Sequence, residues 1–276
     1  FQAEDGIRDF CLSRGLGDVY KRQIMLRSDL IIAGSNFIFS HIKENYSELL
    51  TFKKKFLVIF RGINVDYFDP SSKLEEDEKK LLTKWEINKE KKIILVPGRL
   101  TSWKGQEMLI EAINLTKVEL GYEAFHLVIL GSHQGRDLYK KKLIRITEQH
   151  RLTNQIKFID HCKDMALAYQ VSDIVISPSI EPEAFGRVAV EAQSMEKLII
   201  ASNIGGSNET IINEKTGFLF EAGDVNSLSK KIIQAITMDE SSLKLIGKEG
   251  RKNVIKKFNV EKMCFSTYSE YKRLVN

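Results

Sequence analysis

Two glutamates eight positions apart, Glu183 and Glu191, form the pattern in this sequence with the clearest chemical meaning. A short β-branched run precedes them and helical apolar spacing follows from Phe185 to Met195, so the pair spans a strand-to-helix junction. At a helical rise, eight residues cover about 12 Å, which is the reach from a sugar ring past two phosphates to a ribose. Because open α/β sheets bind ligands at the carboxyl ends of their strands, the pattern predicts a nucleotide-sugar site.

The backbone between the two glutamates is suited to hold a phosphate. The N–H groups at the start of the expected helix have no helical partner and can donate to an anion, and Gly186 allows close approach. Glu181 competes with Glu183 for the first role because it lies two positions earlier, but the spacing favours Glu183. The expected donor-binding residues of this segment are Ala184, Phe185, Gly186, Arg187 and Val188.

Two cations, Arg99 and Lys104, follow an earlier apolar run from Ile93 to Val96. A sugar diphosphate leaves as a nucleoside diphosphate, so negative charge develops on its oxygens and a metal-free enzyme must meet it with fixed cations and amides. Arg99 offers a planar fork, and Lys104 offers a compact charge at the start of the next helix. Taken singly, these residues and the glutamates would be ordinary solvated side chains; their order along the chain indicates a site.

The segment SIEPEAFGRVAVEA, residues 179–192, resembles the Glu-x7-Glu motif of retaining glycosyltransferases of the GT-B fold, in particular glycosyltransferase family four. The segments IILVPGRLTSWKGQEMLIEAI, KLIIASNIGGSNETI and EKTGFLFEAGDVNSL match the same family, and the resemblance runs from about Ile24 to the carboxyl end. It implies that Glu191 binds the ribose and that Glu183 contacts the transferred sugar and helps to stabilise the transition state. Many relatives carry glycine where Ala184 stands, which questions a positive φ there.

The resemblance places the nucleotide base near the loops that follow two later strands. Gly131 and the turn from His161 to Met165 are the candidates, largely through backbone groups, and Gly98 joins the donor-binding set through its Gly-Arg-Leu motif. UDP-, GDP- and ADP-linked donors all remain open. The segment GSHQG lacks the third glycine and the spacing of a dinucleotide fingerprint, so a nicotinamide dehydrogenase is not indicated.

The elements that must position these residues alternate between strands and helices. Such alternation predicts an α/β fold with a Rossmann-like parallel sheet covered by helices on both faces, the donor domain of a GT-B fold, plus a remnant of an amino-terminal domain. Strands are expected at Leu30–Ala33, Ile93–Val96, Phe125–Leu130, Ile156–Ile159, Ile174–Ser177, Leu198–Ala201 and Phe218–Phe220.

Four segments are expected along the chain. Residues 1–23 resemble translated sequencing-adapter sequence and are expected to be non-native and assembly-derived, a genuine loop being the alternative. Residues 24–55 are expected to be the remnant of the amino-terminal acceptor domain, otherwise missing, with Ser35 as a helix cap. Residues 56–240 are expected to form the donor domain, beginning with an interdomain crossing. Residues 241–276 are expected to be helical, and the last helix is expected to cross back toward the amino-terminal domain. Its apolar face would be partly exposed if that domain is absent; the alternative is that this face packs on the donor domain.

Composition narrows the possible partners. A net charge of +5 without a Lys/Arg stripe and interleaved aromatics does not favour nucleic acid, and no apolar stretch reaches the roughly 20 residues that span a bilayer. Three scattered cysteines and five histidines without ligand spacing predict a reducing compartment and no metal site. We therefore expect a cytoplasmic protein, with peripheral contact on the inner face of the cell membrane left open.

These observations together predict a fragment of a retaining, metal-independent glycosyltransferase of the hexosyltransferase type. It would transfer a sugar from a nucleotide diphosphate sugar, without a cofactor, to a glycan or glycolipid hydroxyl in envelope polysaccharide or lipopolysaccharide synthesis. The fragment alone is expected to be inactive, because the interdomain cleft supplies the acceptor and its orientation. Two alternatives stay open: a non-catalytic nucleotide-sugar binding module, and a sugar-nucleotide epimerase of the GT-B fold that needs no acceptor.

Overall fold

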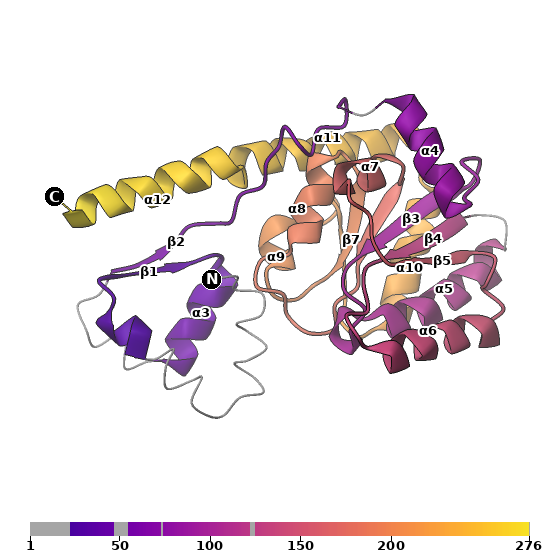
Figure 1. Cartoon of the computed structure of the whole chain (residues 1–276), viewed down its shortest axis with the longest axis horizontal. Helices are drawn as coiled ribbons and strands as arrows, with labels where there is room; N and C mark the ends of the chain where they lie inside the picture. The colour runs from indigo at the N-terminus through magenta and orange to yellow at the C-terminus, as the bar shows by residue number, and fades with distance from the viewer. Residues whose placement is uncertain (1–22, 47–54, 73, 122–124, 276) are drawn as a thin grey trace.

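Two parallel sheets organise the protein in a computed structural model that describes residues 23–46, 55–72, 74–121 and 125–275 (Figure 1). A two-stranded sheet pairs β1 (Leu30–Ala33) with β2 (Lys55–Val58), and a six-stranded sheet has the order β5-β4-β3-β6-β7-β8. These six strands are β3 (Lys92–Pro97), β4 (Phe125–Leu130), β5 (Ile156–Ile159), β6 (Ile174–Ser177), β7 (Leu198–Ser202) and β8 (Phe218–Phe220). The predicted α/β fold is confirmed, and every strand expected from the alternation lies within one residue of its predicted bounds.

The strand order of the larger sheet reverses between β3 and β6. The chain runs outward from β3 to β4 and β5, then returns to place β6 on the other side of β3, with Ile94 beside Ile174. Open α/β sheets bind ligands beyond the carboxyl ends of their strands at such a switch point. The loop after β3 carries Arg99 and Lys104, and the loop after β6 carries Glu183, so both predicted halves of the site leave the sheet at this switch point.

Helices cover both faces of the six-stranded sheet (Figure 1). Successive strand residues point to opposite faces, so Ile93 and Leu95 join one buried cluster while Ile94 and Val96 join the other. The first cluster lies against α4 (Glu75–Trp85), α7 (Met165–Gln170), α8 (Arg187–Ser194) and α11 (Glu240–Lys257). The second lies against α5 (Gln106–Leu120), α6 (Asp137–Gln149) and α10 (Val225–Thr237).

The two-stranded sheet and helix α3 (Asn36–Asn45) form a separate smaller part of the structure, and Ser35 caps α3 by accepting from the Ile38 N–H. The boundary expected between residues 55 and 56 falls inside β2, whose pairing with β1 carries the smaller part to Val58. An apolar run such as FLV has the same pattern whether it is the last strand of one sheet or the first strand of the next. The strand with which it pairs therefore decides to which sheet it belongs. The segment assigned to a non-native origin lies, apart from Gln23, outside the described residues.

Two connections between the parts run side by side. Ile63, on the crossing that follows β2, accepts from Val260 N–H at 3.0 Å and donates to the Phe258 carbonyl at 2.9 Å. Gly62 packs so closely here that a Cβ would lie 2.3 Å from the Asn259 carbonyl oxygen. The outgoing crossing therefore lies against the point where the chain returns into α12 (Val260–Val275).

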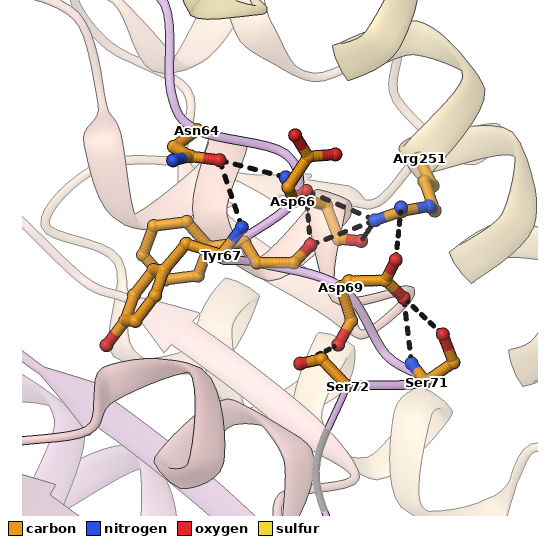
Figure 2. Close-up of polar contacts among 9 residues, drawn as sticks. Asn64, Asp66, Tyr67, Asp69, Ser71, Ser72 and Arg251 are labelled. Carbon is orange, nitrogen blue, oxygen red and sulfur yellow. Dashed lines mark hydrogen bonds and ion pairs between the residues drawn. The ribbon is translucent and has the colours of Figure 1, made fainter.

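Arg251 on α11 fastens the crossing to the larger part (Figure 2). Its Nη1 donates to the carbonyls of Phe68 at 2.9 Å and Ser194 at 2.6 Å, and its Nη2 lies 3.5 Å from Asp69 Oδ2. Asp69 also accepts from the backbone and hydroxyl of Ser71, which together with Arg251 hold the pKa of that carboxyl below its ordinary value. Because Ser194 ends α8, the guanidinium ties the crossing to the helix that carries Glu191.

We expect Arg251→Met to lower the free energy of unfolding by about 1.5–3 kcal/mol, because two carbonyls lose a charged donor while the aliphatic volume is kept. Urea unfolding followed by circular dichroism measures the change. Arg273→Met is the control, since Arg273 forms an exposed pair with Glu270 on α12 and should cost less than about 1 kcal/mol. Equal losses in the two variants would show that this fastening adds no stability.

The last helix, α12, leaves the larger part and extends past the two-stranded sheet (Figure 1). None of its residues is buried, and Phe265, Tyr268 and Tyr271 are exposed. A cavity of about 630 Å³ separates α12 from Leu57 and Val58 of β2. The helical apolar spacing predicted a helix correctly; Met263 at its start contacts Gly62, whereas the aromatic side chains farther along are exposed. Among the described helices, none is both long and apolar enough to span a bilayer.

Candidate functional site

Glu183 lies in the loop between β6 and α8 with 9% of its surface exposed. Its Oε1 accepts from Lys104 Nζ at 2.8 Å, from Ser179 Oγ at 2.5 Å and from Ser177 Oγ at 3.3 Å. The Lys104 side chain is itself 13% exposed, so the pair is largely shielded from water. Glu181, the competing residue, is exposed, which favours Glu183 for the role expected at this position.

The protonation of Glu183 follows from these contacts. Burial by itself raises the pKa of the carboxyl, but Lys104 and the two serine hydroxyls outweigh burial and hold the pKa below its ordinary value. Glu183 is therefore an ionised carboxylate at neutral pH. A fixed, shielded negative charge of this kind can accept hydrogen bonds from a ligand hydroxyl and stabilise positive charge that develops on a neighbouring atom.

Lys104 reaches Glu183 because the loop after β3 packs directly on the loop after β6. The short 3₁₀ helix η2 (Ser102–Lys104) ends at Gly105, and the Trp103 carbonyl accepts from the Ile180 N–H at 2.8 Å. The Lys104 ammonium also lies 4.5 Å from the centre of the Trp103 ring, a cation–π contact that helps to position the side chain. The two loops therefore form one continuous polar region beyond the carboxyl ends of β3 and β6.

Glu191 lies one turn into α8 with 7% of its surface exposed, and two residues orient its carboxylate. The Tyr169 hydroxyl donates to Oε2 at 2.9 Å, and Arg187 Nη2 donates to Oε1 at 2.8 Å. Burial, the Glu191 carboxylate and more weakly that of Glu183 raise the pKa of Tyr169 well above its ordinary value, so its hydroxyl keeps its proton. Both predicted carboxylates therefore raise the pKa of the same buried tyrosine, Glu191 through a direct hydrogen bond and Glu183 through its charge.

The helix that carries Glu191 starts later than the sequence predicted. Gly186 has φ +81° and is the N-cap without a side-chain capping bond, so α8 begins at Arg187 instead of Phe185. Only glycine adopts such a φ at no cost, and the apolar spacing alone could not reveal it. Ala184 is not among the residues with positive φ, so alanine fits this position. The Phe185 ring is buried against Phe258 and anchors the loop, leaving backbone N–H groups around Gly186, Arg187 and Val188 at the helix start.

The other predicted residues lie on neighbouring loops at the same edge of the sheet. Gly98 and Gly131 follow β3 and β4, where Gly98 N–H donates to the Leu130 carbonyl. The Arg99 carbonyl accepts from Gln106 Nε2 at 2.9 Å, which ties its backbone to α5. Met165 begins α7, and its N–H donates to the Tyr67 hydroxyl of the crossing. The predicted residues in direct side-chain contact are Lys104 with Glu183 and Arg187 with Glu191.

Several residues of the site were not found from the sequence. Arg187 was predicted as a donor-binding residue, but its ion pair with Glu191 was not, although a spacing of four on a helix is a readable signal for such a pair. Ser177 and Ser179 were also missed; they alternate along the strand end and so present their hydroxyls on one side. Tyr169 comes from a different helix, and no local pattern links it to Glu191.

The six-stranded parallel sheet flanked by helices matches the fold of GT-B glycosyltransferase structures. Residues 77–253, more than half of the chain, match the family described as Glycosyl transferases group 1, and the chain belongs to this family. The predicted glycosyltransferase resemblance is confirmed at this level.

Individual relatives agree with the assignment. The chain is 30% identical over 217 residues to the capsular polysaccharide biosynthesis glycosyltransferase CapM of Staphylococcus aureus, an alignment covering 79% of this chain and 53% of that protein. A glycosyltransferase structure from Rickettsia africae superposes with a TM-score of 0.85 at 35% identity, covering 94% of this chain and 66% of the other. Anabaena HepE, solved in complex with UDP and glucose, has a TM-score of 0.79 at 22% identity and covers 93% and 67%. The chain spans about half the length of the curated relatives it matches.

Proposed function

We propose that this chain is the donor-binding, carboxyl-terminal part of a retaining family-four glycosyltransferase. The whole protein would transfer a hexose from a nucleotide diphosphate sugar to a glycan or glycolipid hydroxyl in the cytoplasm, for envelope polysaccharide or lipopolysaccharide synthesis. The observation that carries the proposal is the buried, ionised Glu183 held by Lys104 at the switch point between β3 and β6. The capsular polysaccharide relative and the UDP and UDP-glucose bound by the Anabaena protein support the donor class.

In this proposal the diphosphate lies over the start of α8, where backbone N–H groups and the helix dipole favour an anion. Lys104 can donate to Glu183 and to a phosphate oxygen at the same time, because an ammonium group has three N–H donors. Arg99, on the same loop, would contribute the second cation. No metal is needed where two cations and several amides meet the charge of the leaving group.

The two carboxylates would divide the rest of the donor. Glu191 would accept from the ribose hydroxyls, with Tyr169 and Arg187 holding the carboxylate in a fixed orientation. Glu183 would face the transferred sugar and stabilise the positive charge that develops on it as the nucleoside diphosphate leaves. The base would lie against the loops at Gly131 and Met165, which is possible at Met165 only if Tyr67 gives up its bond to the N–H.

Titration calorimetry of UDP, GDP and ADP with this chain in EDTA tests the donor site. We expect one nucleotide to bind saturably without metal. Arg99→Ala and Glu191→Gln are each expected to weaken that binding by about 1.5–3 kcal/mol, because each removes a charge-assisted hydrogen bond. Glu181→Gln is the matched control in the same loop and should bind as the wild type does. Two results would contradict the site. One is a nucleotide that binds only when EDTA is left out, and the other is wild-type affinity in a folded Glu191→Gln variant.

The same complex distinguishes binding from turnover. We expect this chain alone to hold the nucleotide sugar without transferring it, because orientation by the acceptor side can supply about 7–11 kcal/mol of the barrier. Nuclear magnetic resonance spectra of the donor after incubation should show it unchanged. An epimerised sugar would instead assign the site to an epimerase.

A further inference from the structure

Helix α3 of the smaller part is capped by a carboxylate that comes from the larger part. Glu209 Oε2 accepts from the Asn36 backbone N–H at 2.8 Å and from Asn36 Nδ2 at 2.7 Å, while Oε1 accepts from the Phe37 N–H at 2.6 Å. A negative charge at a helix N-terminus is stabilised by the unpaired N–H groups and the helix dipole. These bonds join residues more than 170 positions apart, so they form only when the two parts meet.

A second bond from the same helix end reaches the loop that contains Glu183. The Ser35 hydroxyl, which accepts from Ile38 N–H, donates to the Ala184 carbonyl at 2.5 Å. Ser35 is fully buried, so no water competes for this bond. The peptide group between Ala184 and Phe185, one residue beyond Glu183, is therefore held by a residue of the smaller part.

Glu209 is itself linked to that loop through the two glycines that precede its helix, α9 (Ser207–Thr210). Gly206 N–H donates to the Glu183 carbonyl at 2.8 Å, and a Cβ on Gly206 would lie 2.4 Å from Phe185 Cα. Only a residue without a side chain allows this approach. The Glu183 loop is thus held on one side by the α9 turn and on the other by Ser35.

We propose that Glu209 and Ser35 act as a polar latch that couples the position of the smaller part to the conformation of the Glu183 loop. Helix α3 has no buried residue, so these polar contacts contribute much of what holds its N-terminus against the larger part. Neither residue touches the substrate in this scheme; both are positioning residues that act through Ala184 and the α9 turn. The coupling is independent of nucleotide binding, and only its consequence for sugar transfer rests on the proposed function.

Hydrogen–deuterium exchange on the 276-residue chain tests the latch directly. Glu209→Ala should speed exchange of the Asn36 and Phe37 amides by about tenfold or more, since each loses a charged acceptor, and should also speed exchange in peptides covering 181–188. Ser35→Ala should loosen the same 181–188 peptides. Glu209→Gln keeps one of the two accepting oxygens but loses the other and the charge, so it should give intermediate exchange rates at Asn36 and Phe37.

Two controls separate a latch from general destabilisation. Glu221→Ala removes an exposed glutamate of the larger part and should leave all these rates unchanged. Amides of β3 and β6 should exchange at wild-type rates in every variant, because the latch lies outside the core. Faster exchange confined to α3 in Glu209→Ala, with 181–188 unchanged in both variants, would overturn the coupling, as would equal acceleration in the core strands. If no nucleotide binds the wild-type chain, the proposed function is wrong. The exchange rates would still show whether Glu209 and Ser35 couple the smaller part to the Glu183 loop.

Discussion

Lys104→Met is expected to lower the free energy of unfolding at neutral pH by about 3–5 kcal/mol, because it leaves the ionised Glu183 buried without its cation. The two serine hydroxyls remain, but they cannot replace a positive charge in a shielded site. Urea unfolding at pH 7 measures the loss. The double variant Lys104→Met with Glu183→Gln should recover most of it, because a neutral amide requires no counter-charge. A loss below about 1 kcal/mol in the single variant would show that the pair behaves as a surface ion pair.

The pH dependence of this effect has opposite signs in the two proteins. In the wild type the folded-state pKa of Glu183 is lowered, so its contribution to stability is complete above the ordinary pKa and is lost as pH falls through the lowered value. Without Lys104, burial raises the folded-state pKa above the ordinary value. The variant then gains stability as pH falls, and its deficit against the wild type should be smaller at pH 5 than at pH 7.

Gly105→Ala is expected to cost about 2–4 kcal/mol of unfolding free energy, the second largest effect. Gly105 has φ +71°, and a Cβ there would lie 1.9 Å from the Pro178 carbonyl oxygen, so the loop with Lys104 must move away from the loop with Glu183. Gly223→Ala is the matched control, because its φ of +82° is similar and nothing lies within 4 Å of the added carbon. It should cost only the roughly 1 kcal/mol of a left-handed alanine. Equal losses in the two variants, measured by thermal or urea unfolding, would show that the loops can separate freely.

Local patterns were sufficient to predict the strands, whereas the candidate site was predicted from local patterns together with a family resemblance. Strands such as Phe125–Leu130 are buried on both faces, and a continuous apolar run bounded by turn residues is a strong signal. Glu183 and Lys104 were predicted together from a family resemblance and from their places after two strands, and their direct contact follows from the strand order. The start of α8 was predicted too early because a glycine N-cap leaves no mark in apolar spacing.

Contacts between distant segments were beyond the sequence. The bond from Tyr169 to Glu191, the fastening by Arg251 and the capping of α3 by Glu209 each join elements with no shared period. Each contact depends on which side chains tertiary packing brings together, and local patterns in a single sequence do not indicate such long-range contacts. The place of the run around residue 56 depends on a distant contact in the same way, since only the pairing of β2 with β1 joins the run to the smaller part.

The adjacent passages of the chain at Ile63 and Asn259 limit how the smaller part can swing. One connecting segment would permit rotation about any axis. Two segments that are hydrogen-bonded side by side resist twisting and bend together about one axis, as a hinge does. Arg251 holds the outgoing strand to α11 beyond this point, which confines bending to the few residues before Ile63. If the proposed latch opens, the paired passages would therefore guide α3 about one axis and return it to the same place on the Glu183 loop.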